Sequence, residues 1–574
     1  GGLCTLAAFW LLAAAARPRN LATTLGAALA PLLIAAAPQV MGWTTGGLEG
    51  PLAFALLVGG LLGVLDDGER HADVTDGRVA RLLGLCWRSV PFALLVWTRP
   101  DGPLFAATVG LALALRELPA NGLRRALLAA LAFGALPALA LAAQVAFRWF
   151  YYGDLVPNTA HVKVELGADA WRIGVAYVTD ALYALQGIAW PALGAVLWLL
   201  LRRRARAALP VLLLPLLGWL GYLAAVGGDH FVCYRLLHPA LAPLGLLVAW
   251  AARHLGHSRI ALAVLAVATL TGTAANVALD RTLPLCTMVR DEQWEWQGKV
   301  VGEVLGEAFE ARQPTIAVAA AGAVPFYSRL PALDLLGLCD RTIARTKTPA
   351  WAAAAAAAGG LVRPQGHLRG NGDYVMTRAP DLIQFGTPPG MPLPVFLSGI
   401  EFEGDPRFLD GYRLIVIDVP KRDWAHGLGG ALTTYLWVRV EGRAGVARSD
   451  GRLEIPGHLL GGYRLPMPLI ARYEPQTPER RAELVRLAER LGPQRAFGVV
   501  PAAGGALELR IRRAASVALE LELPADAGAW HARVEPEAEL DVAIEVDGAN
   551  GRVTLTPRAG AELPIAVRQI VLTR

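Results

Sequence analysis

Four short polar segments stand out in the first half of the chain, because each interrupts apolar sequence and carries ionisable side chains. They cover residues 43–49, 97–102, 151–163 and 227–235. Ionisable groups at membrane depth are costly and are usually functional, although arginine and lysine near an interface can extend their heads to water. A single segment of this kind could hold a structural ion pair or an interfacial anchor. Four of them favour a shared polar pocket.

The cations of these segments suit a phosphate or pyrophosphate, because arginine offers a bidentate fork and lysine a point charge. We therefore predict substrate binding by three cations and their polar neighbours. The predicted substrate-binding residues are Arg99, Asp101, Tyr152, Asp154, Asn158, His161, Lys163, His230 and Arg235. A carboxylate can serve as a general base or contact sugar hydroxyls. Glu49 and Asp229 are the secondary candidates for a catalytic carboxylate. The cysteines show no metal-ligand spacing, so we predict no cofactor and leave a divalent metal open.

The elements that must position these segments are membrane helices. Residues 1–280 are a near-continuous series of Leu, Ala, Val and Gly, whereas no stretch after Arg281 approaches the roughly 20 apolar residues that span a bilayer. Several of the apolar segments are short, so we expect tilted, broken or half-crossing helices among them. The segments are 3–16, 21–41, 51–65, 82–97, 103–115, 126–147, 173–201, 207–226, 236–250 and 260–279.

The distribution of arginine predicts an orientation. Clusters such as those at residues 78–81, 116–125 and 202–206 fall in alternate loops, which the positive-inside rule assigns to the cytoplasm. The four polar segments and the whole region after residue 280 then lie on the extracytoplasmic face. The same distribution explains the formal net charge of +6, so we predict a lipid bilayer partner and no nucleic acid.

The second half of the chain predicts mixed structure. Residues 281–474 are expected to form an α/β region, with strands at 315–321 and 413–419. Residues 475–574 are expected to form a helix followed by a small β-sandwich, with strands at 507–511, 517–523, 541–546 and 552–556. Asn550-Gly551 between the last two is a strong hairpin signal. Such a module could bind glycans or serve as a structural cap.

Taken in order, the motifs resemble those of a known group. They are Gly47-Leu48-Glu49, residues 98–102, residues 151–159 and the Gly-Gly-Asp motif at 227–229 with Arg235, joined by residues 320–328 and 333–341. This order resembles bacterial polytopic glycosyltransferases of the GT-C type. Among these it is most similar to the actinobacterial terminal β-(1→2)-arabinofuranosyltransferase family and its uncharacterised relatives. The resemblance covers about residues 43–374 and does not identify the sugar.

The resemblance implies a GT-C-like membrane domain in residues 1–280 and an inverting glycosyltransferase. The donor would be a sugar, such as arabinofuranose, on a polyprenyl phosphate, and the acceptor an envelope glycan outside the bacterial plasma membrane. In this family the catalytic acid is expected in the first external loop, which nothing here matches, because Asp66-Asp67 falls on the predicted cytoplasmic side. We therefore expect the catalytic residue upstream of Gly1. The alternatives are a transporter or flippase of a lipid-linked sugar and a non-catalytic assembly protein that binds envelope glycans.

Overall fold

A computed structural model provides the structure of the 574-residue chain. It describes all residues except 19–20, 71–77, 165, 203–204, 230, 256–257, 283–292, 349–368, 395, 403, 421–431, 465–485, 487–490, 492–494, 503–505, 522–529, 536–540 and 574. The chain divides into two compact units. The first comprises Gly1–Ala160 and Val164–Glu292, and the second comprises His161–Lys163 and Gln293–Arg574.

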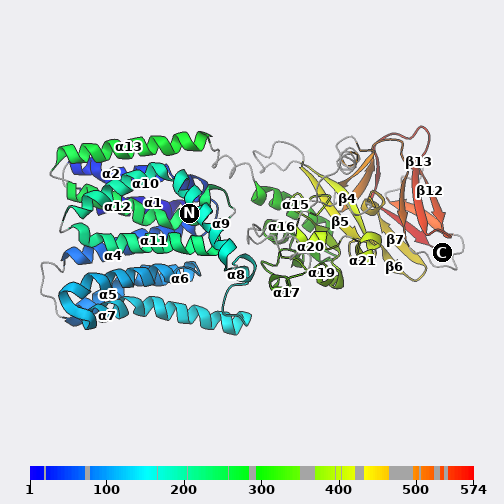
Figure 1. The fold of residues 1–574 in the computed structure, drawn as a ribbon. Coiled ribbons are helices and arrows are strands. Elements are labelled where there is room, and N and C mark those ends of the chain that lie inside the picture. The colour runs from blue at the N-terminus through cyan, green and yellow to red at the C-terminus, as the bar shows by residue number, and fades with distance from the viewer. Residues whose placement is uncertain are drawn as a thin grey trace. The chain divides into compact units, whose positions relative to one another are not determined.

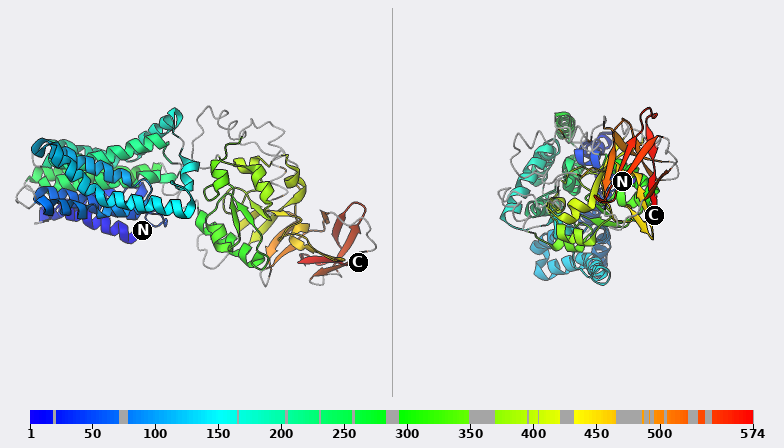
Figure 2. Two further views of the ribbon diagram at one scale, coloured as in Figure 1. Left: turned by 90° about the horizontal axis from the view of Figure 1, so that it is seen from below. Right: turned by 90° about the vertical axis from the view of Figure 1, so that its right-hand side faces the viewer.

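The first unit is a bundle of helices that run side by side in Figure 1 and in the left view of Figure 2. Its α-helices are α1 (Gly2–Ala15), α2 (Leu21–Ala35), α3 (Pro38–Trp43), α4 (Gly50–Arg70), α5 (Arg78–Arg88), α6 (Val90–Thr98), α7 (Pro103–Tyr152), α8 (Asn158–Lys163), α9 (Ala168–Ala184), α10 (Gln186–Leu200), α11 (Leu209–Val226), α12 (Leu241–Leu255) and α13 (Arg259–Thr282). Two 3₁₀ segments, η1 (Ala205–Ala208) and η2 (Val232–Ala240), precede α11 and α12. The last three residues of α8 belong to the second unit.

Five helical segments of the described chain are long and apolar enough to cross a bilayer, and six if the bent pair α9 and α10 is one span. The five are Val79–Thr98, Asn121–Tyr152, Ala205–Val226, Cys233–Leu255 and Arg259–Arg281. The protein is therefore a multi-pass membrane protein, as the apolar segments predict. The α12 helix is apolar on nearly all sides and buried along its length, which is expected of a helix at the centre of a bundle.

Helices of this unit are broken at two places. Residues 173–201 divide at Leu185, where α9 and α10 meet at 85°. Beyond this bend α10 packs tightly on α13, because a Cβ on Gly187 would lie 2.2 Å from the Gly272 carbonyl oxygen. Small residues allow membrane helices to approach this closely. In α7, Gly122 adopts φ 72° and ψ 169°, which breaks the helix between the two predicted segments at 103–115 and 126–147.

The second unit is built around an eight-stranded mixed sheet with the order β14-β9-β8-β4-β5-β3-β1-β2. Its strands are β1 (Ile316–Val318), β2 (Ala332–Asp334), β3 (Leu382–Gln384), β4 (Tyr412–Val419), β5 (Leu432–Arg439), β8 (Phe497–Pro501), β9 (Leu507–Ile511) and β14 (Ile565–Val567). The β1 strand pairs in parallel with β2 and β3, and β4 pairs in parallel with β8. Along β4, Leu414 and Val416 face one apolar cluster while Ile415 and Ile417 face another, as period-two alternation requires.

Short helices and two small antiparallel sheets complete this unit. The helices are α15 (Trp294–Phe309), α16 (Ala323–Ser328), α17 (Arg341–Arg345), α19 (Gly372–Arg378), α20 (Leu397–Ile400), α21 (Pro406–Gly411) and α22 (Gly457–Leu460). One small sheet has the order β10-β13-β12 and the other β11-β15-β7-β6. Their strands are β6 (Ala447–Ser449), β7 (Arg452–Pro456), β10 (Val517–Glu520), β11 (His531–Glu535), β12 (Val542–Asp547), β13 (Arg552–Pro557) and β15 (Gln569–Thr573).

The predicted mixed α/β character of the second half is confirmed, and so is the hairpin at Asn550-Gly551, where Asp547 pairs with Arg552 across the turn. The boundary between residues 474 and 475 stays a prediction, and the sheets cross it. The β8, β9 and β14 strands join β4 in one sheet, and β15 pairs with β7 in another. The helix predicted at the start of residues 475–574 lies almost entirely outside the described residues.

Candidate functional site

Arg99 is the centre of the first polar group of the membrane unit. It follows the end of α6 and is only 8% exposed. Its Nη1 donates to Glu49 Oε1 at 2.6 Å, and its Nε and Nη2 donate to the two carboxylate oxygens of Asp101, both at 2.8 Å. These three residues are called the Arg99 cluster. They bring together the polar segments 43–49 and 97–102, because Glu49 precedes α4 and Asp101 precedes α7.

Asp229 and Arg235 form the second group, here called the Asp229 pair. Both Nε and Nη2 of Arg235 donate to Asp229 Oδ2, at 3.1 and 2.9 Å. The Asp229 side chain is 5% exposed and also accepts the Phe231 backbone N–H at 2.9 Å. The Arg235 guanidinium lies 4.0 Å from the centre of the Phe231 ring and 5.8 Å from that of Trp43. Aromatic faces favour a cation at such distances.

The η2 segment connects the two groups. Trp219 on α11 donates its indole N–H to the carbonyl of Leu236 at 2.8 Å, and the Arg99 guanidinium lies 5.7 Å from the Trp219 ring. Cys233 and Tyr234 at the start of η2 have φ values of 59° and 47°, which are uncommon for residues other than glycine. Such strained backbone is concentrated at functional sites. The Arg99 cluster and the Asp229 pair together are the candidate site.

Two buried polar side chains lie on the elements behind these groups. His238 of η2 is 1% exposed, and a Cβ on Gly50, the residue after Glu49, would lie 3.1 Å from its Nδ1. Neither of its ring nitrogens has a hydrogen-bond partner among the residues that the structure describes. The same holds for both amide atoms of Gln39, which is fully buried on α3 one turn before Trp43. Buried polar groups are almost always satisfied. His238 and Gln39 are therefore candidates to receive a ligand or water.

The first part of the polar segment 151–163 contains three of the predicted substrate-binding residues. Tyr152 ends α7, is 61% exposed and contacts the ring of Tyr151 at 4.7 Å. It lies about two helical turns beyond Gln144, which binds the Val96 carbonyl near the end of α6. Asp154 lies in the loop that follows, and Asn158 is the first residue of α8.

His161 and Lys163 belong to the second unit. The His161 carbonyl accepts from Arg369 Nη2 at 3.0 Å, and its ring nitrogen Nε2 lies 3.3 Å from Arg345 Nη2. Val162 between them is buried. This segment is therefore a packed part of the second unit. His230 lies outside the described residues, so its predicted role stays a prediction.

The motif at residues 333–341 in the second unit is structural. Asp334 ends β2, and its carboxylate accepts the backbone N–H groups of Leu336 at 2.9 Å and Cys339 at 2.7 Å. Burial raises the pKa of Asp334, and these hydrogen bonds oppose that shift. Asp340 caps α17 through the Ile343 N–H at 2.9 Å and accepts the Tyr374 hydroxyl at 3.1 Å. Both carboxylates thus order a turn.

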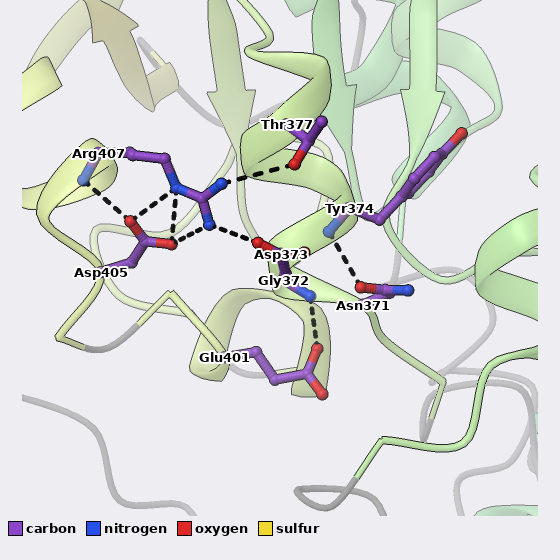
Figure 3. Close-up of polar contacts among 8 residues, drawn as sticks. All are labelled: Asn371, Gly372, Asp373, Tyr374, Thr377, Glu401, Asp405 and Arg407. Carbon is purple, nitrogen blue, oxygen red and sulfur yellow. Dashed lines mark hydrogen bonds and ion pairs between the residues drawn. The ribbon is translucent and has the colours of Figure 1, made fainter.

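A polar network around α19 and α21 continues this pattern (Figure 3). Arg407 donates to both Asp405 and Asp373, and Asn371 caps α19 through the Tyr374 N–H at 3.0 Å. Glu401 accepts the Gly372 N–H at 2.7 Å. The hydrogen bonds from Arg407 lower the pKa of Asp405. Each group has a partner inside the network, so the network fixes two short helices.

The elements that sequence reasoning missed are the aromatic and buried ones. Trp219, His238 and Gln39 lie in predicted apolar segments, and Phe231 lies in the polar segment 227–235, where only ionisable side chains were selected. The isolated polar residues Gln39 and His238 within apolar runs were the available signal. In the described chain, no three His, Cys, Asp or Glu side chains gather in a way that could hold a metal ion.

The fold and the site define a multi-pass membrane protein with a mixed α/β second unit and paired arginine–carboxylate groups at one end of its helices. A domain family of unknown function, DUF8728, matches residues 287–432. The chain also shows a distant, partial similarity to the terminal β-(1→2)-arabinofuranosyltransferase of Mycobacterium tuberculosis, with 33% identity over 159 residues. That match covers 23% of this chain and 24% of the relative, so it spans about a quarter of the length of the curated relative. No solved structure matches.

Proposed function

We propose that this protein is a glycosyltransferase that moves a sugar from a polyprenyl phosphate to an envelope glycan on the extracytoplasmic face of a bacterial membrane. The observation that carries the proposal is the candidate site. Two arginines and three carboxylates from three separate places in the sequence lie near η2 at one end of a membrane helix bundle. The partial similarity to a membrane arabinofuranosyltransferase supports the reaction class. The nature of the sugar is left open.

The two groups suit different parts of such a donor. In the Arg99 cluster one arginine is held by two carboxylates, which gives a net charge of −1, and carboxylates readily accept hydrogen bonds from sugar hydroxyls. The Asp229 pair is neutral, and its Arg235 side chain is 24% exposed against 9% for Arg99. Arg235 is therefore the better candidate for the donor phosphate. His238 and Gln39 add neutral hydrogen-bonding groups for hydroxyls.

The proposed reaction is a single displacement. An acceptor hydroxyl oxygen attacks the anomeric carbon from the face opposite the phosphate, and the bond from that carbon to the phosphate oxygen breaks. The polyprenyl phosphate leaves with the bonding electrons, and an arginine stabilises its growing charge. The hydroxyl proton passes to a carboxylate acting as general base.

Glu49 is the carboxylate of the candidate site best placed to take that proton. Its side chain is 42% exposed, whereas those of Asp101 and Asp229 are 11% and 5% exposed. Only one Glu49 oxygen binds Arg99, at 2.6 Å. The expectation that the main catalytic acid lies upstream of Gly1 remains a prediction, and Glu49 would then orient the acceptor.

Movement of a lipid-linked sugar across the membrane is the second candidate function. The observation that favours it is the 85° bend between α9 and α10, because transporters build their sites from broken membrane helices. A non-catalytic assembly protein that binds envelope glycans would need neither Glu49 nor the bend.

Purified full-length protein tests these functions directly. It would be given radiolabelled sugars on polyprenyl phosphate together with envelope glycan acceptors, and product formation would be measured. Glu49→Gln and Arg235→Ala should abolish or strongly reduce transfer, whereas Arg172→Ala, at an exposed ion pair on α9, should not. If the protein moved a lipid-linked sugar across the membrane of proteoliposomes but transferred no sugar to an acceptor, it would be a transporter and not a glycosyltransferase.

A further inference from the structure

A cavity lies at the end of the membrane helices opposite Arg99. It measures about 250 Å³, and its lining includes Arg81, Leu82, Leu85, Glu117, Arg125 and Leu128. Arg81 is near the start of the span Val79–Thr98, and Arg99 follows the end of that span. The cavity is therefore separated from the candidate site by the length of a membrane helix, and the proposed reaction does not use it.

The polar lining is a connected chain of hydrogen bonds. Arg81 pairs with Glu117, which also accepts from the Asn121 amide at 2.9 Å, and the Asn121 oxygen accepts from Arg125 Nη1 at 2.9 Å. The Glu117 side chain is 7% exposed. Two arginines against one buried glutamate give the cavity a net charge of +1. The buried Nε of Arg81 has no partner in the described part of the chain, which leaves a donor for a ligand.

The break at Gly122 places the start of a helix next to Arg125, one of the two arginines of the cavity. The helix that follows the break continues to Tyr152. The first backbone N–H groups of such a helix lack partners within it, and its dipole places partial positive charge there. Arg125 lies in this first turn, so the arginines and the helix end favour an anion in the same place.

One part of the cavity wall, and the helix surface beside the cavity, are apolar. Leu82, Leu85 and Leu128 line it. On the other side of α5, Val79, Leu83 and Trp87 follow a spacing of four residues and are 70%, 58% and 76% exposed. In a membrane protein such a face lies against lipid. A ligand here would have its charged part beside arginine and its apolar part beside leucine.

We propose that this cavity binds the phosphate group of an anionic membrane lipid. The arginines and the helix end would hold the phosphate, and the leucine walls would contact the acyl chains. Basic pockets between membrane helices are known to bind acidic headgroups. A free phosphate ion shares the charged chemistry but would leave the leucine walls without a partner.

The test uses the purified full-length protein in a neutral detergent. Retention of phosphatidylglycerol and phosphatidylcholine would be measured by native mass spectrometry, and thermal unfolding would be recorded with each lipid or with inorganic phosphate. Arg125→Gln removes one cation of the cavity. Arg81→Gln combined with Glu117→Gln removes the other without leaving a buried carboxylate unpaired. Arg124→Gln is the matched control, because Arg124 is the neighbour of Arg125, is exposed like it and does not line the cavity.

We expect phosphatidylglycerol to bind preferentially and to raise the unfolding temperature. Arg125→Gln should weaken its retention about tenfold, which corresponds to about 1.4 kcal/mol. The double variant keeps the net charge of +1 and loses the Arg81 donor, so its retention should fall less than that of Arg125→Gln. Arg124→Gln should bind like the unmodified protein. Equal retention of the two lipids would overturn the proposal, as would an equal loss in Arg124→Gln. Stabilisation by inorganic phosphate as large as that by phosphatidylglycerol would show a small-anion site instead.

Discussion

The Asp229 pair permits a quantitative test of the candidate site, through Asp229→Ala, Arg235→Ala and the double variant. In the double-mutant cycle the interaction between the two side chains is the part of the stability change that is not additive. The exposed pair Asp169 and Arg172 on α9, 3.4 Å apart, provides a matched cycle in the same unit.

The magnitude follows from burial and geometry. Arg235 donates two hydrogen bonds to one oxygen of a side chain that is 5% exposed, but it is itself 24% exposed. A hydrogen bond to a charged group contributes about 1.5–3 kcal/mol, and exposed ion pairs contribute about 0–1 kcal/mol. We therefore expect a coupling energy of about 2 kcal/mol for the Asp229 pair. The Asp169–Arg172 cycle should give less than about 0.5 kcal/mol, because both of its side chains are mostly exposed.

Two assays would be applied to the same preparations. Stability would be measured by denaturant titration of the full-length protein in detergent, and membrane fractionation would show whether each variant still inserts. Sugar transfer from polyprenyl phosphate would be measured in parallel. We expect both single variants to insert normally and to lose transfer by at least about 100-fold, or about 2.7 kcal/mol of transition-state stabilisation.

Two results would contradict this reasoning. Additive stability changes at Asp229 and Arg235 would mean that the pair does not form. Unchanged transfer in both single variants would remove residues 227–235 from the candidate site, even if the coupling energy were as expected.

Three further predictions concern other parts of the molecule. Arg99→Lys keeps the charge but loses the fork that binds Asp101 at two oxygens, so sugar transfer in a radiolabel assay should fall about tenfold to 100-fold, with normal membrane insertion. Gly187→Ala should destabilise the protein by about 1–3 kcal/mol in denaturant titration, because its Cβ would clash with Gly272, whereas Gly194→Ala has open space and should be close to neutral. Burial lowers the pKa of His458 to about 4 from its usual 6.5, so folding stability should be full above pH 6.5 and fall towards pH 4 by up to about 3 kcal/mol. His458→Gln should remove that part of the pH dependence in thermal unfolding measured across this range.

Local patterns in the sequence predicted much of the fold. The strand predicted at 507–511 is β9, with the same bounds, because its alternation and flanking turns lie within a few residues. The membrane spans followed from the length of their apolar runs. Broken helices were expected among the apolar segments, but the position of the bend at Leu185 was not predicted. Gly187 packs against Gly272 just beyond this bend, and the two are far apart in the sequence.

The candidate site, too, was predictable from the sequence in part. The ionisable residues Glu49, Arg99, Asp101, Asp229 and Arg235 were found because charges are conspicuous in apolar sequence, and the structure groups them as two sets. Which carboxylate binds which arginine was not predictable, since it depends on how α6, α7 and η2 pack. Asp334 and Asp340 are explained by backbone hydrogen bonds, which a sequence motif does not distinguish from a binding role.

The strand order of the second unit affects how this region is made during translation. The β7 strand pairs with β15 so that Arg452 lies opposite Thr573. The β14 strand is an edge strand of the eight-stranded sheet and pairs there with β9. A nascent chain that has passed β9 still exposes the unpaired edges of β7 and β9. Non-local pairings of this kind fold slowly, and open strand edges are prone to aggregate. The growing chain would therefore benefit from a chaperone until the last strands arrive, and a premature stop codon before Ile565 would leave both sheets incomplete.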